Sequence, residues 1–298
     1  MRRLCEALVR NGVQTKTEYP LAEHSSFRIG GRAELAIFPK DRGELLLVLR
    51  QAASLGVPYV LIGKGSNVLF PDDGLRGAVI FTAGCRGVSI EGKNMTASAG
   101  ESLFSLAVAA QRASLSGLEF AHGIPGTLGG ALVMNAGAYG GCMGDVCVKS
   151  EYFDTETGEI GELCGNQHLF DYRSSIYEKN PSYAVLGATL CLKAGNAEEI
   201  RAVMEDYKSR RRASQPLEYP SAGSAFKRPV GYFAGKLIED AGLKGYTVGG
   251  AQVSQKHAGF IINRGGATAR DVHALVEHVQ STVLRQFGVE LEPEIRFL

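Results

Sequence analysis

The stretch that decides the fold is Gly123–Gly141, which reads GIPGTLGGALVMNAGAYGG. A flexible linker has no use for the apolar residues interspersed in it, which are Ile124, Leu128, Val133 and Met134. Glycine removes the side chain that would otherwise keep a backbone away from a neighbouring group. We therefore interpret this stretch as backbone that lies against a bound ligand.

A second glycine-containing loop follows the apolar strand expected at 59–62 and reads Gly63-Lys64-Gly65-Ser66-Asn67. Converging amide groups in such a loop suit a pyrophosphate. The loop is not the dinucleotide fingerprint, because Val68 stands where that motif needs glycine and no acidic residue follows at the usual distance. Read alone, it is equally compatible with an ordinary turn.

Three polar motifs lie further along the chain, and they read YRSS at 172–175, SAGSAFKRP at 221–229 and EPE at 292–294. A serine on a tight turn followed by two cations could donate a proton or bind phosphate. The GxSxG elbow of acyl-transfer enzymes is absent. Taken singly, Arg173 and Glu294 read as surface polar residues.

The composition, with 45% apolar and 21% charged side chains, is that of a globular protein. A length of 298 residues is too great for one small core, so we expect more than one domain. Its 38 glycines amount to about 13% of the chain against about 7% in average proteins. The 32 basic and 31 acidic residues nearly cancel. This balance argues against nucleic-acid and membrane-surface binding.

Redox and targeting signals favour a cytoplasmic protein without membrane insertion. The six cysteines form no CxxC pair, and the first residues, MRRLCEALVRNG, lack an apolar signal core. No apolar run approaches the roughly 18 to 20 residues that span a bilayer. His273 and His278 lie five apart, and the lysine in AGKL at 234–237 lacks the remainder of a P-loop, so we expect neither a metal site nor triphosphate hydrolysis.

Periodicity and capping signals predict an α+β chain. Asp41, Asn196 and the pair Thr268 and Asp271 are expected caps. We expect helices at 44–55, 103–113, 198–212, 235–241 and 268–288, and strands at 59–62, 95–99, 184–192 and 289–297. The last helix is expected to bury Val272, Leu275, Val276, Val279, Val283 and Leu284.

Taken together and in this order, SFRIGG at 26–31, the 63–67 loop, the glycine-rich stretch, YRSS, SAGSAFKRP and the terminal EPEIRF resemble the UDP-N-acetylenolpyruvoylglucosamine reductases. The resemblance covers nearly the whole chain. It implies a two-subdomain FAD-binding unit of the p-cresol methylhydroxylase/vanillyl-alcohol oxidase (PCMH/VAO) type plus a C-terminal α+β domain for the UDP-sugar. The expected bounds are 1–80 and 81–206 for the FAD subdomains, the second joined by the last strand at 289–298, and 207–288 for the UDP-sugar domain.

By the resemblance, the protein reduces UDP-N-acetylglucosamine enolpyruvate with NADPH through bound FAD, a step of peptidoglycan precursor synthesis. The chain has no long insertion between YRSS and SAGSAFKRP, and in this it resembles the shorter type II subgroup of the family. The implied catalytic residues are Arg173, Ser224 and Glu294. The residues expected to bind FAD are Gly63, Lys64, Gly65, Ser66, Asn67, Gly123, Ile124, Pro125, Gly126, Thr127, Gly129, Gly130, Asn135, Ala136, Gly137 and Ala138. The residues expected to bind the UDP-sugar are Tyr172, Lys227, Lys244 and Asn263.

Two alternatives stay open at this point. The first is a PCMH/VAO-type FAD oxidase of another alcohol or sugar, which covalent flavin attachment would favour, although His24, His122 and His168 lie in no recognisable attachment motif. The second is a non-catalytic nucleotide-sugar-binding protein. The presence of Ser224 argues against the second, because binding alone needs no proton donor.

Overall fold

The computed structural model describes all 298 residues and divides into two compact units. Unit 1 consists of Met1–Thr17, Leu35–Lys64 and Gly77–Arg210, and unit 2 of Glu18–Glu34, Gly65–Arg76 and Arg211–Leu298. The chain therefore passes between the units several times, and each unit is described by itself.

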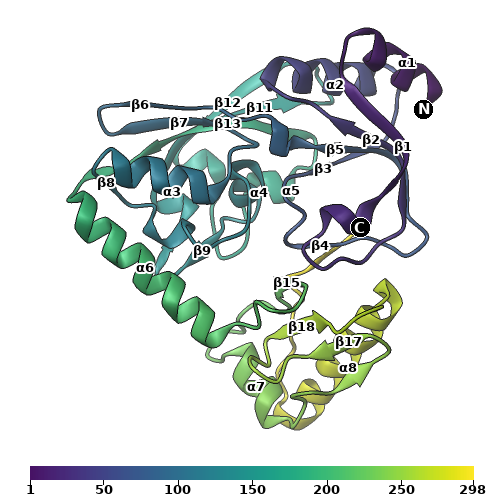
Figure 1. Ribbon diagram of the computed structural model, residues 1–298, viewed down its shortest axis with the longest axis vertical. Helices are drawn as coiled ribbons and strands as arrows, with labels where there is room; N and C mark the ends of the chain where they lie inside the picture. The colour runs from purple at the N-terminus through teal and green to yellow at the C-terminus, as the bar shows by residue number, and fades with distance from the viewer. The chain divides into compact units, whose positions relative to one another are not determined.

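The larger sheet of unit 1 is antiparallel and has the strand order β12-β11-β13-β7-β6. Its strands are β6 Val88–Glu91, β7 Asn94–Ser98, β11 Cys147–Asp154, β12 Ile160–Cys164 and β13 Tyr183–Cys191. The helices α3 Leu103–Arg112 and α4 Leu128–Val133 lie on one side of this sheet (Figure 1). Their apolar residues share one core with the sheet, which includes Met95, Leu106, Leu132 and Leu190.

A second sheet has the strand order β1-β2-β5-β3, in which β3 and β5 are parallel. Its strands are β1 Gln14–Pro20, β2 Arg32–Phe38, β3 Tyr59–Ile62 and β5 Leu75–Phe81. The helices α1 Arg2–Arg10 and α2 Arg42–Ser54 cover it, and Leu45, Val48 and Leu49 of α2 are fully buried. Asp41 caps α2 as expected, because its carboxylate accepts a hydrogen bond from the Glu44 amide at 2.8 Å.

Unit 1 also contains short strands and the helix that leads out of it. The short strands are β8 Leu115–Ser116, β9 Gly137–Ala138, β10 Gly141–Cys142 and β14 Lys193–Ala194, and a single helical turn, α5, spans Ile176–Lys179. The long helix α6 spans Ala197–Ser214 and begins at Asn196, whose side chain accepts hydrogen bonds from the Glu198 and Glu199 amides. The 3₁₀ turns are Leu21–His24, Thr82–Gly84, Glu119–Ala121, Met143–Asp145 and Gly165–His168.

Unit 2 packs two helices against a four-stranded antiparallel sheet of order β15-β18-β17-β16. The strands are β15 Ser221–Ser224, β16 Thr247–Val248, β17 Ala251–Val253 and β18 Phe260–Asn263, and the helices are α7 Ala234–Asp240 and α8 Ala269–Phe287. Thr268 and Asp271 form the expected capping box of α8, and Gly288 ends it in the left-handed conformation. In the same unit, β4 Val68–Leu69 pairs in parallel with β19 Arg296–Phe297.

The expected helices and the strands at 59–62, 95–99 and 184–192 are confirmed to within a few residues, but two expectations at the C-terminus are wrong. Leu284 is 51% exposed and lies outside the buried stripe of α8, because the helix nears its end there. Only Arg296–Phe297 of the expected strand 289–297 is regular, and it pairs with β4 of unit 2 instead of joining 81–206. The division into two FAD subdomains and a UDP-sugar domain stays a prediction.

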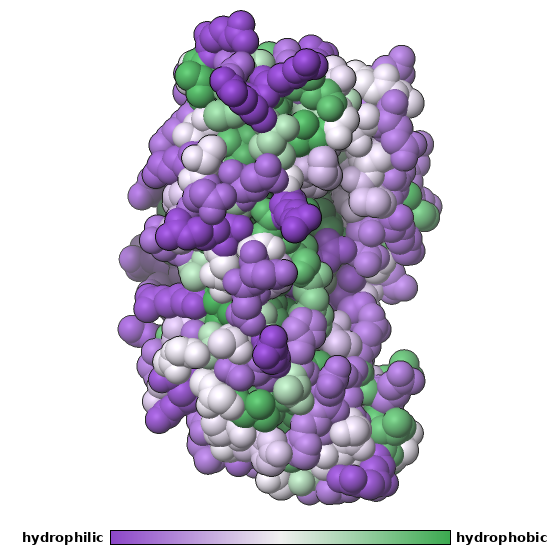
Figure 2. Space-filling model, turned by 90° about the vertical axis from the view of Figure 1, so that its right-hand side faces the viewer, coloured by the Kyte–Doolittle hydropathy of each residue, from purple (hydrophilic) through white to green (hydrophobic).

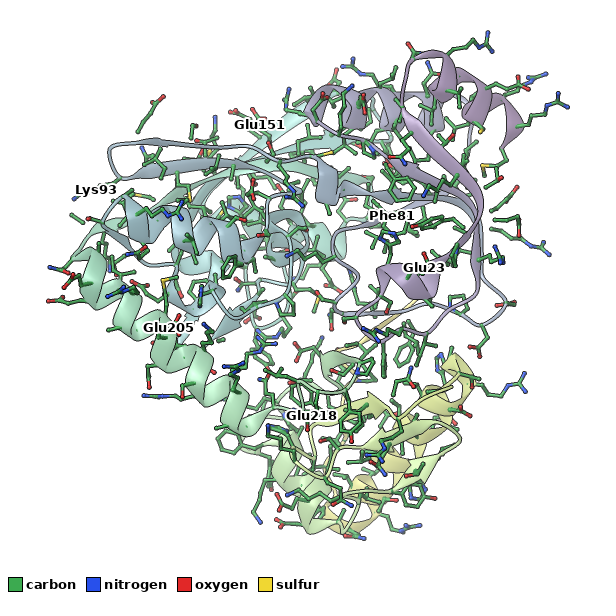
Figure 3. All side chains as sticks on the ribbon, in the orientation of Figure 1. Glu23, Phe81, Lys93, Glu151, Glu205 and Glu218 are labelled. Atoms are coloured by element: carbon green, nitrogen blue, oxygen red, sulfur yellow. The ribbon has the colours of Figure 1, made fainter.

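The surface carries mixed polarity. Hydrophilic side chains predominate on the face drawn in Figure 2, and apolar ones appear in separate groups. None of the helices combines the length and the apolar character that a membrane span requires.

Candidate active site

Arg173 lies at the tip of a tight turn in unit 1. The backbones of Asp171 and Ser174 pair through two hydrogen bonds of 3.0 and 3.2 Å, which leaves Tyr172 and Arg173 between them. Arg173 has a φ of +54°, a left-handed conformation that is uncommon for residues other than glycine. The guanidinium donates to the Gly137 carbonyl at 3.2 Å and lies 5.1 Å from the Tyr172 ring centre. The chain therefore presents this cation in a defined orientation.

This turn is attached to the glycine-rich stretch. The side-chain amide of Asn135 donates to the Asp171 carbonyl at 3.0 Å and accepts from the Gly144 amide at 2.8 Å. Ser175 donates to the Val133 carbonyl at 2.9 Å. The Asn135 side chain is buried and bonded on both ends, so it holds the turn of Arg173, and the expected contact of Asn135 with FAD stays a prediction.

Two buried polar atoms next to this stretch have no hydrogen-bond partner within the protein. They are Oγ1 of Thr127, a residue that is 1% exposed, and Nδ1 of His122. A Cβ placed on Gly63 would overlap Thr127 Oγ1, so Gly63 must remain glycine for the two segments to lie this close. Because buried polar groups are normally satisfied, Thr127 Oγ1 fits a bound polar ligand such as FAD.

The His122 ring lies towards α6, 5.0 Å from the ring of Phe104, and it forms a hydrogen bond with the backbone of Met204. Burial lowers its pKa, which keeps the imidazole neutral and leaves an unprotonated ring nitrogen able to accept a hydrogen bond.

Two backbone amides at the start of α4 are bonded within the protein. The amides of Leu128 and Gly129 donate at 2.8 Å to the carbonyls of Glu101 and Ala99. They are therefore used inside the protein, and the expected role of Gly129 in FAD binding stays a prediction. Glycine is needed there for packing, since a Cβ on Gly129 would lie 3.1 Å from that of Ala99.

The 63–67 loop also has structural duties. The chain passes from unit 1 to unit 2 between Lys64, which is exposed, and Gly65. Gly65 has a φ of +62°, and a Cβ there would overlap the His24 carbonyl. The Asn67 side chain donates to the Glu294 carbonyl at 3.0 Å, and the Asn67 carbonyl accepts from the Arg296 amide at 3.0 Å. Roles of this loop in FAD binding stay predictions.

Unit 2 brings Ser224 and Glu294 close in its backbone pairing. The Glu294 amide donates to the carbonyl of Ala225, the residue after Ser224, at 2.8 Å, and Phe226 forms a β-bridge with Pro293. The pairing of β15 with β18 is irregular between Ser221 and Ser224, and Gly223 between them has a φ of +80°. Such an irregularity changes the direction of the following side chain, here that of Ser224.

The residues expected to bind the UDP-sugar differ in their surroundings. Lys227 forms an ion pair with Glu292 at 2.5 Å and Lys244 one with Glu239 at 2.8 Å, so each cation lies beside a carboxylate. Asn263 is 7% exposed, donates to the Phe27 carbonyl at 3.1 Å and accepts from the Gly265 and Ala267 amides. This side chain holds the protein's own backbone, and its expected contact with the UDP-sugar stays a prediction. Tyr172 is 49% exposed beside Arg173.

Comparison with known proteins identifies both parts of the chain. Residues 33–163 match the family model described as FAD binding domain. Residues 215–298 match the model described as UDP-N-acetylenolpyruvoylglucosamine reductase, C-terminal domain. The FAD binding domain together with the C-terminal domain of a reductase identifies a flavin-dependent oxidoreductase.

Relatives along the whole chain are more specific. The UDP-N-acetylenolpyruvoylglucosamine reductase of Caldanaerobacter subterraneus is 50% identical over 94% of this chain and 92% of the relative. That of Clostridioides difficile is 48% identical over 95% and 93%. The crystal structure of the enzyme from Thermus caldophilus aligns with a TM-score of 0.79 and 35% identity over 96% of this chain and 98% of that one. The chain belongs to the UDP-N-acetylenolpyruvoylglucosamine reductase family.

Proposed function

We propose that this protein uses NADPH to reduce UDP-N-acetylglucosamine enolpyruvate to UDP-N-acetylmuramate, in the cytoplasmic synthesis of peptidoglycan precursors. The observation that carries the proposal is the backbone pairing of Ala225 with Glu294 in a chain of this family. This pairing places a hydroxyl and a carboxylate on neighbouring segments of unit 2. A reduction that adds a hydride and a proton across a double bond needs such proton-handling groups.

FAD, when bound, accepts a hydride from NADPH and supplies it to the terminal carbon of the enolpyruvyl group. Hydride addition forces negative charge onto the neighbouring carboxylate, which takes on enediolate character. We assign to Arg173 the stabilisation of that charge. A guanidinium held by a fixed carbonyl, as that of Arg173 is by Gly137, is already oriented when the charge develops.

Ser224 is the proposed proton donor to the carbon next to the new C–H bond. A serine hydroxyl can serve despite its high pKa because the enolic carbon is itself strongly basic, and water restores the hydroxyl proton afterwards. Glu294 is proposed to hydrogen-bond or protonate the enediolate oxygen. The bulge at Gly223 supports the role of Ser224, because such irregularities re-aim side chains next to active sites.

Binding of the UDP pyrophosphate is assigned to Lys227 and Lys244, with Tyr172 as a further contact. A nearly neutral chain must meet a dianion with local cations. The carboxylates of Glu292 and Glu239 hold these lysines until the phosphate replaces them.

Membership in the reductase family argues against both alternatives raised by the sequence. A non-catalytic protein would have no need of Arg173, Ser224 and Glu294 together. An oxidase would pass electrons to oxygen instead of to an enol ether.

A product assay tests the proposal. The purified protein is supplied with FAD, NADPH and UDP-N-acetylglucosamine enolpyruvate without oxygen, and the product is analysed by mass spectrometry. We expect a product with two more hydrogens than the substrate, in a one-to-one ratio with oxidised NADPH. Oxidation of NADPH with an unchanged sugar would refute the assignment.

A further inference from the structure

Ser150 is a fully buried hydroxyl in the middle of β11, in unit 1. Its Oγ lies 2.7 Å from His168 Nε2 and 2.6 Å from the Tyr177 hydroxyl. His168 is 0% and Tyr177 4% exposed. None of the three residues belongs to the proposed catalytic or binding groups. The buried polar cluster is therefore considered for the segments of the chain that it holds together.

The hydrogen bonds of the cluster have one consistent direction. Nδ1 of His168 lies 2.8 Å from the carbonyl of Gly165, which can only accept, so Nδ1 carries the hydrogen and Nε2 is the acceptor. Ser150 has one hydrogen, which it donates to His168, and it therefore accepts from Tyr177. The chain of donors runs from Tyr177 through Ser150 and His168 to Gly165, and every member is satisfied.

Burial keeps the members of this chain neutral. It lowers the pKa of His168 and raises that of the Tyr177 hydroxyl. Cys147 Sγ lies 3.8 Å from His168 Nε2, and burial raises the pKa of this thiol to about 12. A neutral and fully bonded network in a low-dielectric interior is rigid.

The two partners of Ser150 flank the turn that carries Arg173. His168 precedes Arg173 by five residues and Tyr177 follows it by four. Between them the Asp171–Ser174 pairing closes the turn. Both arms of the turn are therefore attached, through different side chains, to one hydroxyl on a central strand of the sheet.

We propose that Ser150 is a positioning residue for Arg173: it fixes both arms of the turn, and so holds the Arg173 backbone in its left-handed conformation and the guanidinium in place. This inference rests on the proposed function, because it concerns the role of Arg173 there. Charge stabilisation depends on exact placement of the donor, and a displacement of about 1 Å can lower a rate about 100-fold. Reduction of the flavin by NADPH creates no carboxylate charge and does not depend on this placement.

The test compares the two half-reactions in the FAD-loaded Ser150→Ala variant by anaerobic stopped-flow spectroscopy. We expect reoxidation of the flavin by UDP-N-acetylglucosamine enolpyruvate to slow at least about tenfold, while reduction by NADPH stays within about twofold. Amide hydrogen exchange over residues 169–175 is expected to quicken at the same time. The exchange measurement does not depend on activity.

Two variants control for loss of stability. Val48→Ala removes buried volume from α2, a part of unit 1 with no bond to the turn, and is expected to leave both half-reactions unchanged. Tyr177→Phe removes only the donor into Ser150 and is expected to slow reoxidation less than Ser150→Ala does. If Ser150→Ala does not fold, Tyr177→Phe carries the test.

Arg173→Ala separates the inference from the proposed function. If Arg173→Ala leaves reoxidation unchanged, the catalytic assignment of Arg173 fails. If Arg173→Ala slows reoxidation but folded Ser150→Ala and Tyr177→Phe do not, or slow both half-reactions equally, the positioning role is overturned and the proposed function stands.

Discussion

The side-chain amide of Asn67 donates a hydrogen bond of 3.0 Å to the backbone carbonyl of Glu294, 227 residues further along the chain. The Asn67 carbonyl in turn accepts from the Arg296 amide at 3.0 Å. Together with the bond from the Glu294 amide to Ala225, these contacts fix the backbone of Glu294 on both sides. The segment that carries a proposed catalytic carboxylate is thus held by a loop that the sequence assigned to FAD.

The first prediction follows from this contact. Asn67→Asp replaces the donor with an oxygen that faces the Glu294 carbonyl, which costs about 1–3 kcal/mol and displaces the carboxylate. We expect reoxidation of the flavin by the UDP-sugar to slow about tenfold, measured by stopped-flow spectroscopy. Asn94→Asp, at an exposed site on β7, is the control. An unaltered rate in Asn67→Asp would show that this contact does not serve Glu294.

The second prediction concerns the proton donor. Ser224→Ala leaves reduction of the flavin by NADPH nearly intact and slows reoxidation by the UDP-sugar by about 10²- to 10⁴-fold, because general acid catalysis is lost. Ser221→Ala, at the other end of β15, is expected to leave both rates unchanged. Equal losses in the two half-reactions of Ser224→Ala would contradict its role as proton donor.

The third prediction concerns the carboxylate. Glu294→Gln keeps the shape of the side chain, but the amide can neither carry a negative charge nor give up a proton as a carboxyl group does. We therefore expect reoxidation by the UDP-sugar to slow while FAD stays bound. The expected loss is about 10²-fold or more. Visible absorbance measures both FAD content and rate, and Glu290→Gln, at an exposed position, is the control. A colourless Glu294→Gln protein would mean that the residue is structural.

The fourth prediction tests the expected binding of FAD by the segments around Gly63 and Thr127. In Gly63→Ala the new Cβ overlaps Thr127 Oγ1 and forces the two segments apart. Overpacking of this kind costs about 1–3 kcal/mol, which corresponds to a loss of FAD affinity of about tenfold or more. Fluorescence titration of the apoprotein with FAD measures it. Gly43→Ala in the first turn of α2, where only the Asp41 side chain lies near, should bind FAD normally.

The fifth prediction is a pH dependence of stability. Burial lowers the pKa of His168 below its ordinary value of 6.5, so below that pH the unfolded chain binds a proton that the folded protein rejects. The free energy of unfolding must therefore fall as the pH decreases from 6.5 towards the folded-state pKa. The groups against the ring are Ser150, Cys147, the Gly165 carbonyl and the stacked Phe170 ring, and none of them is charged near neutral pH.

Urea denaturation at pH 7.5 and 5.5 checks this prediction. His168→Gln is less stable than the unaltered protein at the higher pH, because the donor chain is broken, but it loses less stability between the two conditions. His122 and His257 also have pKa values lowered by burial and contribute equally to both proteins. An equal pH-dependent loss in both proteins would exclude His168 as a source of the acid sensitivity.

Local signals in the sequence were sufficient for most of the fold. The Asp41 cap, the Thr268 and Asp271 capping box and the left-handed Gly288 mark helix ends by short-range chemistry, and the structure has them where the sequence put them. The C-terminal strand was predicted wrongly because its signal is also local. The alternation of 289–297 indicates which side chains are buried, but not which strand they pair with. Its actual partner, Val68–Leu69, is distant in sequence.

The site divides in the same way. The motifs around Gly63 and Thr127 could be found because close packing of a side chain onto a backbone requires glycine, which is visible in the sequence. The hydrogen bonds of the Asn135 and Asn263 side chains could not be predicted, because the sequence does not show which distant carbonyl an amide will meet. Ser150 gave no signal at all, since its meaning depends on His168 and Tyr177 meeting it in space.

The proposed reduction of the UDP-sugar by NADPH through bound FAD is tested most directly by the visible spectrum of the purified protein without oxygen. The spectrum is recorded before NADPH, after NADPH, and after addition of UDP-N-acetylglucosamine enolpyruvate. For this reaction we expect flavin bands that bleach with NADPH and return completely with the UDP-sugar. Bands that return only when oxygen is admitted, or a protein that shows no flavin spectrum even after FAD is supplied, would contradict it.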